Sequence, residues 1–184
     1  MEIKIIKPEI AKRADIRYPH YIDKIFSSHR KPPYAAAFAR SAVPGRLERV
    51  ARIGQVEFIN DVFATSINGV YYALNRSRGP LVWMVCNDNA ALAWEELSPV
   101  MVYKTRHIVA CGAAAGRLDA LYGSRIPVST AKNLEDAVRW ALRVAKPGSK
   151  VLFSPGTSLP CGLKTIEAGK KFRQILKNIE QHIL

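Results

Sequence analysis

From Arg46 onward, short apolar runs alternate with segments in which apolar residues recur at every third or fourth position. This alternation is the sequence form of strand–helix–strand units, in which crossover helices join parallel strands. The run Leu81–Cys86 has no polar interruption, which favours a strand covered by helices on both of its faces. We therefore expect an α/β domain whose helices flank a mostly parallel sheet.

The hydrophobic pattern also predicts where the elements lie. Strands are expected at 47–53, 55–59, 81–86, 107–111, 126–128 and 151–153. Helices are expected from a cap at Ser66 to about Arg76, at about 91–103, near 114–122, and from a cap at Asn133 to Pro147-Gly148. A final helix, with apolar positions from Ile166 to Ile183, is expected after a loop at 154–161. Asp136, three residues after Asn133, completes a capping arrangement.

The first 44 residues differ from the rest of the chain. They contain five prolines, scattered charges and only short periodic stretches, which is a weak pattern for a packed core. We treat 1–44 as a basic N-terminal segment, either an arm or a partial addition to the sheet. Residues 45–184 then form the α/β domain.

The chain is strongly basic, with a formal net charge of +13. Residues 1–52 carry twelve Lys and Arg against five Asp and Glu, so the excess is concentrated at the front. Such a charge favours contact with polyanions. However, the sequence has no aromatic stacking platform and no groove-reading motif, so a solvated basic surface is the preferred explanation and nucleic-acid binding is not expected.

The lengths of the apolar runs and the spacing of the cysteines indicate where in the cell the protein is expected. No apolar run exceeds six residues, which is too short to span a bilayer, so we expect no membrane association. Cys86, Cys111 and Cys161 are an odd number at wide spacings, which fits neither a disulfide framework nor a paired zinc-ligand pattern. We therefore expect reduced, mostly buried thiols in a cytoplasmic protein.

Seven sequence pieces occur in an order and at spacings that carry a family resemblance. They are Arg46-Leu47-Glu48, Phe58-Ile59-Asn60-Asp61 with Ala64-Thr65, Ala73-Leu74, Gly79-Pro80-Leu81-Val82-Trp83, Leu134-Glu135-Asp136-Ala137-Val138, Ala145-Lys146-Pro147-Gly148 and Val151-Leu152-Phe153-Ser154-Pro155, followed by Lys164, Glu167, Gly169 and Phe172. From residue 45 to about 180 this pattern resembles the C-terminal, Rossmann-like domain of the Mur ligases, in particular the branch that adds D-glutamate.

The resemblance implies a six-stranded, largely parallel sheet that closes over ATP and D-glutamate in a three-domain cytoplasmic enzyme of peptidoglycan precursor synthesis. Such ligases phosphorylate a carboxylate, and the incoming amino group attacks the acyl phosphate. This chemistry needs a phosphate cradle and a magnesium ion that bridges phosphate oxygens. In the family, the cradle is a Walker-type loop in the central domain.

This chain has no such loop. The nearest approach is 156–165, where five residues separate Gly156 from Gly162 and Leu163 intervenes before Lys164. The motif places lysine directly after the second glycine so that the backbone amides curl around the phosphates. We therefore predict that the chain is not a complete ligase, and that a ligase built on it needs another protein, or a longer chain, to supply the central ATPase domain.

The resemblance also places candidate site residues, and several of them depart from the family pattern. The nucleotide-binding positions correspond to Arg46, Asn60 and Asp61, and the substrate-binding positions to Thr65, Asn89, Ser158, Leu159 and Ile166. Phe63 and Asn89 stand where the family has lysines, and Leu159 stands where it has a glutamate-binding serine, with Ser158 adjacent. Losing the lysines removes charge-assisted hydrogen bonds, which are roughly twice as strong as neutral ones. No catalytic residue and no metal ligand is predicted.

Three functions remain open. The preferred one is a Mur ligase C-terminal-like domain that is non-catalytic alone, acts as a ligand-binding or protein-docking remnant, and binds no cofactor. The alternative is the ATP- and D-glutamate-binding part of a split or truncated ligase, which would use ATP and magnesium. The second alternative is a basic adaptor for polyanions. The surviving residues also have structural explanations, since Asn60 and Asp61 end a strand and Thr65 or Ser66 would serve as a helix cap.

Overall fold

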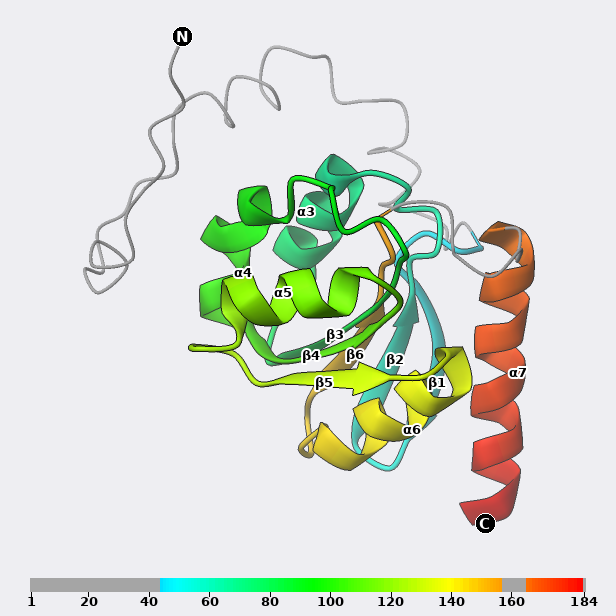
Figure 1. Cartoon of the computed structure of the whole chain (residues 1–184). Coiled ribbons are helices and arrows are strands. Elements are labelled where there is room, and N and C mark those ends of the chain that lie inside the picture. Colours follow the sequence, from blue (N-terminus) through cyan, green and yellow to red (C-terminus); the bar gives the residue numbers. More distant parts are fainter. Residues whose placement is uncertain (1–43, 157–164, 184) are drawn as a thin grey trace, which may run out of the picture. The chain divides into compact units, whose positions relative to one another are not determined.

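The computed structural model describes residues 44–156 and 165–183, which form an α/β domain (Figure 1). The elements are β1 (Glu48–Ile53), β2 (Val56–Asn60), α3 (Ile67–Arg76), β3 (Leu81–Cys86), the 3-10 helix η2 (Trp94–Leu97), α4 (Ser98–Lys104), β4 (Thr105–Cys111), α5 (Ala114–Tyr122), β5 (Val128–Ala131), α6 (Leu134–Val144), β6 (Lys150–Phe153) and α7 (Thr165–Ile183). The six strands lie in the order β1-β2-β6-β3-β4-β5.

The sheet is mostly parallel, as the sequence predicts. β1 pairs with β2 in antiparallel fashion through the tight turn at Gly54, whose φ of +58° suits glycine. The pairs β2–β6, β6–β3, β3–β4 and β4–β5 are all parallel. The last strand, β6, therefore inserts between β2 and β3, and α6 carries the chain back across the sheet to reach it.

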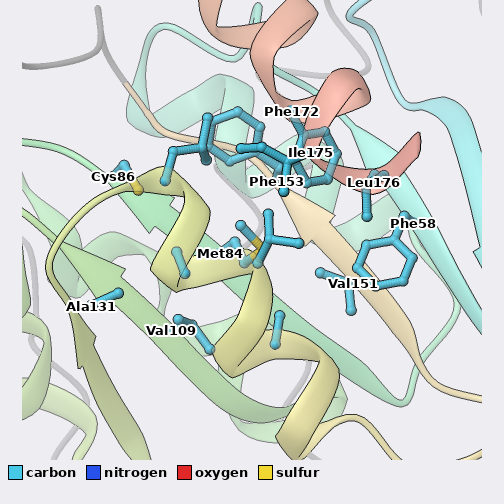
Figure 2. Packing of buried hydrophobic residues seen from close by; sticks show 14 of the residues in the cluster. Phe58, Met84, Cys86, Val109, Ala131, Val151, Phe153, Phe172, Ile175 and Leu176 are labelled. Carbon is cyan, nitrogen blue, oxygen red and sulfur yellow. The ribbon is translucent and has the colours of Figure 1, made fainter. Parts of the chain in front are cut away.

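Helices cover both faces of the sheet. α6 and α7 pack on one face over a cluster that includes Phe58, Phe153 and Phe172 (Figure 2). The ring centroid of Phe172 lies 5.0 Å from that of Phe153 and 6.5 Å from that of Phe58. On the other face, α3, η2, α4 and α5 contact one another (Figure 1), and Trp83 of β3 meets Trp94 of η2 with ring centroids 6.0 Å apart. Successive strand residues point to opposite faces, so every residue of β3 is buried, which explains its uninterrupted apolar run.

The predicted helix caps are confirmed. The Ser66 hydroxyl accepts a hydrogen bond from the Gly69 backbone N–H at 3.2 Å, and α3 ends at Arg76. The Asn133 side chain accepts from the Asp136 N–H at 3.0 Å. These side chains satisfy amide donors that the first turn of a helix leaves unpaired.

Two predicted elements differ from the structure, and a proline explains each difference. The helix expected at 91–103 is divided into η2 and α4, because Pro99 has no N–H for the preceding turn and its ring clashes with that turn's carbonyl. The strand expected at 126–128 instead spans Val128–Ala131, because Pro127 has no N–H to donate to the neighbouring strand.

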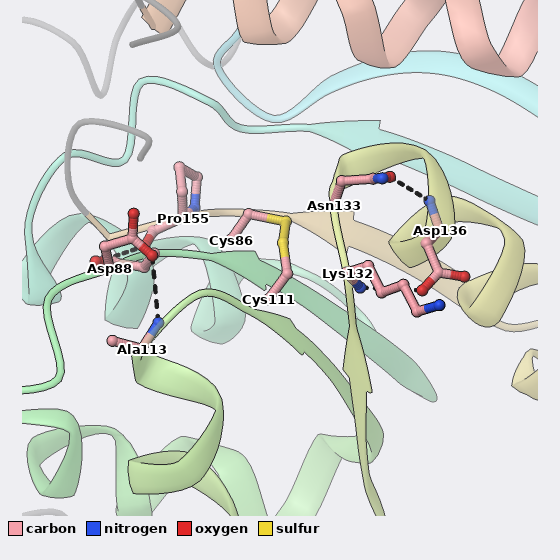
Figure 3. The surroundings of a disulfide bond; sticks show 9 residues. Cys86, Asp88, Cys111, Ala113, Lys132, Asn133, Asp136 and Pro155 are labelled. Carbon is pink, nitrogen blue, oxygen red and sulfur yellow. Dashed lines mark hydrogen bonds between the residues drawn. A yellow bond between two sulfur atoms is a disulfide. The ribbon is translucent and has the colours of Figure 1, made fainter. Parts of the chain in front are cut away.

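The prediction of three reduced thiols is wrong for two of them. Cys86 and Cys111 form a disulfide (Figure 3), and they are paired in register at the ends of β3 and β4 with their Cα atoms 4.4 Å apart. Their separation of 25 residues along the chain conceals this pairing in the sequence. Within the described residues, no helix is long and apolar enough to cross a membrane.

Candidate functional site

The candidate site lies at the edge of the sheet where the parallel strands β2, β6, β3 and β4 end. In open α/β sheets, ligands bind outside the carboxyl ends of strands whose following connections leave toward opposite faces. Here β6 lies between β2 and β3 in the sheet, and it is followed by α7, which packs with α6 on one face. The neighbouring strands β2 and β3 are followed by α3 and η2, which lie on the other face. The predicted residues Asn60 and Asp61 fall at this edge.

Asp61 is a buried carboxyl group with partners inside the domain. It is 3% exposed, its Oδ1 accepts from the Leu47 N–H at 3.1 Å, and its Oδ2 accepts from the Ser154 hydroxyl at 2.9 Å. Burial raises the pKa of Asp61 to about 7, although these hydrogen bonds and the Arg46 guanidinium favour the ionised form. Leu47 has a φ of +44°, so the carboxyl group holds a left-handed residue in place.

Asn60 is also committed to internal contacts. Its Nδ2 donates to Glu48 Oε2 at 3.3 Å, and its Oδ1 accepts from the Val62 N–H at 3.3 Å. The same Glu48 oxygen accepts from the Gly45 N–H at 2.7 Å and from Arg173 of α7 at 3.3 Å. Asn60 is fully buried, and its hydrogen bond to Glu48 ties the end of β2 to the start of β1.

Phe63 occupies a position where the resemblance places a lysine, and its ring is packed. A Cβ atom added at Gly45 would lie 2.7 Å from the ring, so only glycine fits beneath it, and Gly45 has a φ of +77°. The guanidinium carbon of Arg46 lies 5.7 Å from the ring centroid, within cation–π range. The half-buried Arg46 is therefore engaged with Phe63 at this edge.

The loop after β3 is held by an asparagine that the sequence prediction did not single out. Asn87 is fully buried, and its Nδ2 donates to the Pro155 carbonyl at 2.8 Å while its Oδ1 accepts from the Asn89 N–H at 2.7 Å. Asn89 is exposed, and its Oδ1 accepts from the Ala91 N–H at 3.0 Å. A polar residue directly after a buried strand is the signal that would have identified Asn87.

The remaining predicted residues are not gathered around Asp61. Thr65 is exposed in the turn before α3, where its N–H donates to the Phe63 carbonyl at 3.0 Å. Ile166 is 58% exposed in the first turn of α7. Ser158 and Leu159 lie outside the described residues, as does most of the incomplete phosphate loop at 156–165. The structure thus brings together Arg46, Asn60 and Asp61, and links Asn89 to this edge through Asn87.

In the described part of this edge, Arg46 lies in the segment before β1, and the segments that follow the strands carry no positive charge. The described segments that follow β2, β3, β4 and β6, namely 60–65, 87–90, 112–113 and 154–156, contain no Lys or Arg. Of their two carboxyl groups, Asp61 is buried, and Asp88 accepts a hydrogen bond from the Ala113 N–H at 3.3 Å. Within the described part of the chain, no group of three or more His, Cys, Asp or Glu could hold a metal ion.

Comparisons with known proteins identify relatives of the domain. No family model matches the chain. The UDP-N-acetylmuramoylalanine–D-glutamate ligase of Salinibacter ruber is 33% identical over 139 residues, which are 74% of this chain and 30% of that ligase. The corresponding ligase of Solibacter usitatus is 34% identical over 148 residues, which are 79% of this chain and 34% of the ligase. The chain therefore spans about a third of the length of these curated relatives.

A solved structure supports the fold. Mycobacterium tuberculosis folylpolyglutamate synthase, complexed with ADP, superposes with a TM-score of 0.52 at 18% sequence identity. The match covers 84% of this chain and 37% of the synthase. At this level of identity the likeness concerns the arrangement of the sheet and its helices.

Proposed function

We propose that this Mur ligase C-terminal-like domain, which is related to the UDP-N-acetylmuramoylalanine–D-glutamate ligases and spans about a third of their length, does not catalyse ligation by itself. Its function is that of a protein-docking or ligand-binding remnant of such a ligase. The proposed setting is the cytoplasm, where the resemblance places peptidoglycan precursor synthesis.

One observation carries this proposal: the groups that survive at the carboxyl edge are used to hold the domain together. Both side-chain oxygens of Asp61 accept hydrogen bonds from within the domain. The side-chain nitrogen of Asn60 donates a hydrogen bond within the domain, and its side-chain oxygen accepts one. Phe63 fills a lysine position with a ring packed on Gly45 and Arg46. A ligand that needed these groups would first have to break contacts that close the edge.

ATP and magnesium do not fit the described residues. Phosphate oxygens are bound by Lys, Arg and backbone amides, and magnesium prefers exposed carboxylates with several waters. Asp61 is buried and has a raised pKa, so its ionised form is the costly one. The chain alone is therefore proposed to bind neither Mg-ATP nor magnesium.

Calorimetric titration of the full chain with Mg-ATP, and then with D-glutamate, tests the proposal. We expect heats no larger than those of dilution for both ligands. A micromolar dissociation constant for Mg-ATP that is lost in Asp61→Asn would contradict the proposal. Asp88→Asn is the matched control, because it neutralises an exposed carboxylate at the same edge and would leave such binding unchanged.

The alternative is the ATP- and D-glutamate-binding part of a split or truncated ligase, and it is the second candidate because the relatives that the chain matches at 33% and 34% identity are ligases. In that case a separate protein supplies the central ATPase domain. The discriminating experiment adds this chain to the Salinibacter ruber ligase from which the matching third has been deleted, and measures phosphate release that depends on D-glutamate. We expect no restored ligation, whereas restoration that follows the concentration of this chain would establish the split ligase.

A further inference from the structure

The Cys86–Cys111 pair lies directly beneath the loops of the candidate site. The two residues end adjacent parallel strands, are paired in register and are each 4% exposed. Their Cα separation of 4.4 Å falls within the range of disulfides, about 4.4 to 6.8 Å. The bond therefore joins two strand ends that the sheet itself already holds side by side.

We propose that this pair is a reversible dithiol–disulfide switch that sets the local stability of the loops at the carboxyl edge. The inference rests on the proposed cytoplasmic setting and not on ligand binding. The glutathione pool keeps most cytoplasmic thiols reduced, and disulfides found there are usually transient and redox-sensing or catalytic. A disulfide in this chain would then form and break with the redox state of its surroundings.

The oxidant we name is glutathione disulfide. When the edge loops open and expose the buried sulfurs, the Cys86 or Cys111 thiolate attacks it, which breaks its S–S bond, forms a mixed disulfide and releases one glutathione thiolate. The second cysteine then attacks the mixed disulfide and releases the second glutathione. Two cysteines are oxidised, one glutathione disulfide is reduced, and both cysteine protons end on the two glutathione thiols.

The loops after β3 and β4 touch each other next to the bond, where Figure 3 shows the Ala113 N–H donating to the Asp88 side chain. The Asn87 N–H donates to the Cys111 carbonyl at 2.8 Å, and the Ala114 N–H donates to the Asn87 carbonyl at 3.0 Å. A Cβ atom added at Gly112 would lie 2.5 Å from the Asn87 carbonyl oxygen, so the two backbones meet with no side chain between them. Any separation of the two strand ends breaks these contacts first.

Asn87 carries the effect to a third loop. Its side chain donates to the Pro155 carbonyl after β6 and accepts from the N–H of Asn89, a candidate site residue. The redox state of the Cys86–Cys111 pair therefore affects the local stability of the loops that follow β3, β4 and β6.

Reduction disturbs this arrangement because the two sulfurs no longer share a bond of about 2.0 Å and must move apart. Both side chains belong to the buried cluster that also contains Met84 and Val109 (Figure 2), where close packing resists displacement. The side chains must rotate within the cluster, or the strand ends must part. In either case we expect the edge loops to open more often in the reduced form.

Thiol counting in glutathione buffers tests the first half of the proposal. The full chain is equilibrated at a series of glutathione to glutathione disulfide ratios, quenched in acid, denatured, alkylated and weighed by mass spectrometry. We expect two thiols to be protected at oxidising ratios and three to be alkylated at reducing ratios, with the same midpoint from both directions. Three free thiols at every ratio, or a bond that glutathione does not reduce, would overturn the proposal.

Amide hydrogen exchange tests the second half. We expect exchange at Asn87, Ala113 and Ala114 to be at least about tenfold faster in the reduced wild-type chain, with no change in α6. Cys111→Ser should exchange like the reduced form, and Cys161→Ser should keep the full redox response. Equal exchange in the oxidised and reduced wild-type chain refutes the switch, and this comparison does not require the Cys111→Ser variant to fold.

Discussion

At the scale of single residues, Asp61 shows how a carboxyl group at the carboxyl edge of a sheet can use both of its oxygens for hydrogen bonds within the domain. The hydrogen bonds from Leu47 and Ser154 fix the segment before β1 against the end of β6. Its position followed from the sequence, because it ends a predicted strand and matches a family motif. Its burial did not, since it depends on β6 lying beside β2, far away along the chain.

The raised pKa of Asp61 predicts a pH-dependent stability. The unfolded carboxyl group ionises near pH 3.8 and the folded one near 7, so between these values only the folded form keeps the proton. The contribution of this group to the free energy of unfolding is therefore largest below about pH 4 and falls as pH rises to about 7, by ~4 kcal/mol. Urea unfolding at intervals between about pH 5 and 8 measures this slope.

Asp61→Asn should remove most of that slope, because an amide keeps an acceptor for the Leu47 N–H and does not titrate. Asp88→Asn should leave the slope as in the wild-type chain, because Asp88 is exposed. If the wild-type chain and Asp61→Asn lose stability in parallel across this range, another group carries the pH dependence.

At the scale of elements, the sequence predicted the bounds of a helix or strand best where a capping residue or an uninterrupted apolar run marks them. Ser66 and Asn133 cap α3 and α6 as expected, and the apolar run of β3 is bounded at both of its predicted ends. The errors at Pro99 and Pro127 arose where an apolar pattern continued past a proline that cannot donate a backbone hydrogen bond.

The cap at Asn133 provides a prediction for α6. Asn133→Ala removes the acceptor for the Asp136 N–H and should lower the free energy of unfolding by about 1 kcal/mol. Asn75→Ala is the matched control, because Asn75 is exposed within α3 and alanine has the higher helix propensity there. Chemical denaturation of both variants measures the difference, and an Asn133→Ala chain as stable as Asn75→Ala would show that the cap is not needed.

At the scale of the whole molecule, the sheet combines a ligase-like topology with an edge of different chemistry. The alternation of strands and helices predicted the fold class, but the insertion of β6 between β2 and β3 joins distant segments that no local pattern relates. That Phe63 and Asn89 replace family lysines is a prediction from the resemblance alone. The packing of Phe63 on Gly45 and the Cys86–Cys111 bond were not, because both depend on tertiary contacts.

The disulfide predicts a global effect as well as the local one. Closing a loop of 25 residues in the unfolded chain stabilises the native state by ~3.5 kcal/mol in the chain-entropy model. We therefore expect reduction to lower the free energy of unfolding by about this amount in wild-type and Cys161→Ser chains. Cys111→Ser should show no change on reduction, and a wild-type chain equally stable in both states would contradict the expectation.

The most direct measurement is an amide NMR titration of the isotope-labelled full chain with Mg-ATP, to about 1 mM, where a site worth only about −4 kcal/mol would be half filled. We predict that the amides of 60–65, 87–90 and 154–156 keep their positions, because the polar groups of this edge are bound to one another. Saturable shifts confined to these three segments would show that the edge still binds nucleotide, and would contradict a domain that has kept the ligase fold without its chemistry.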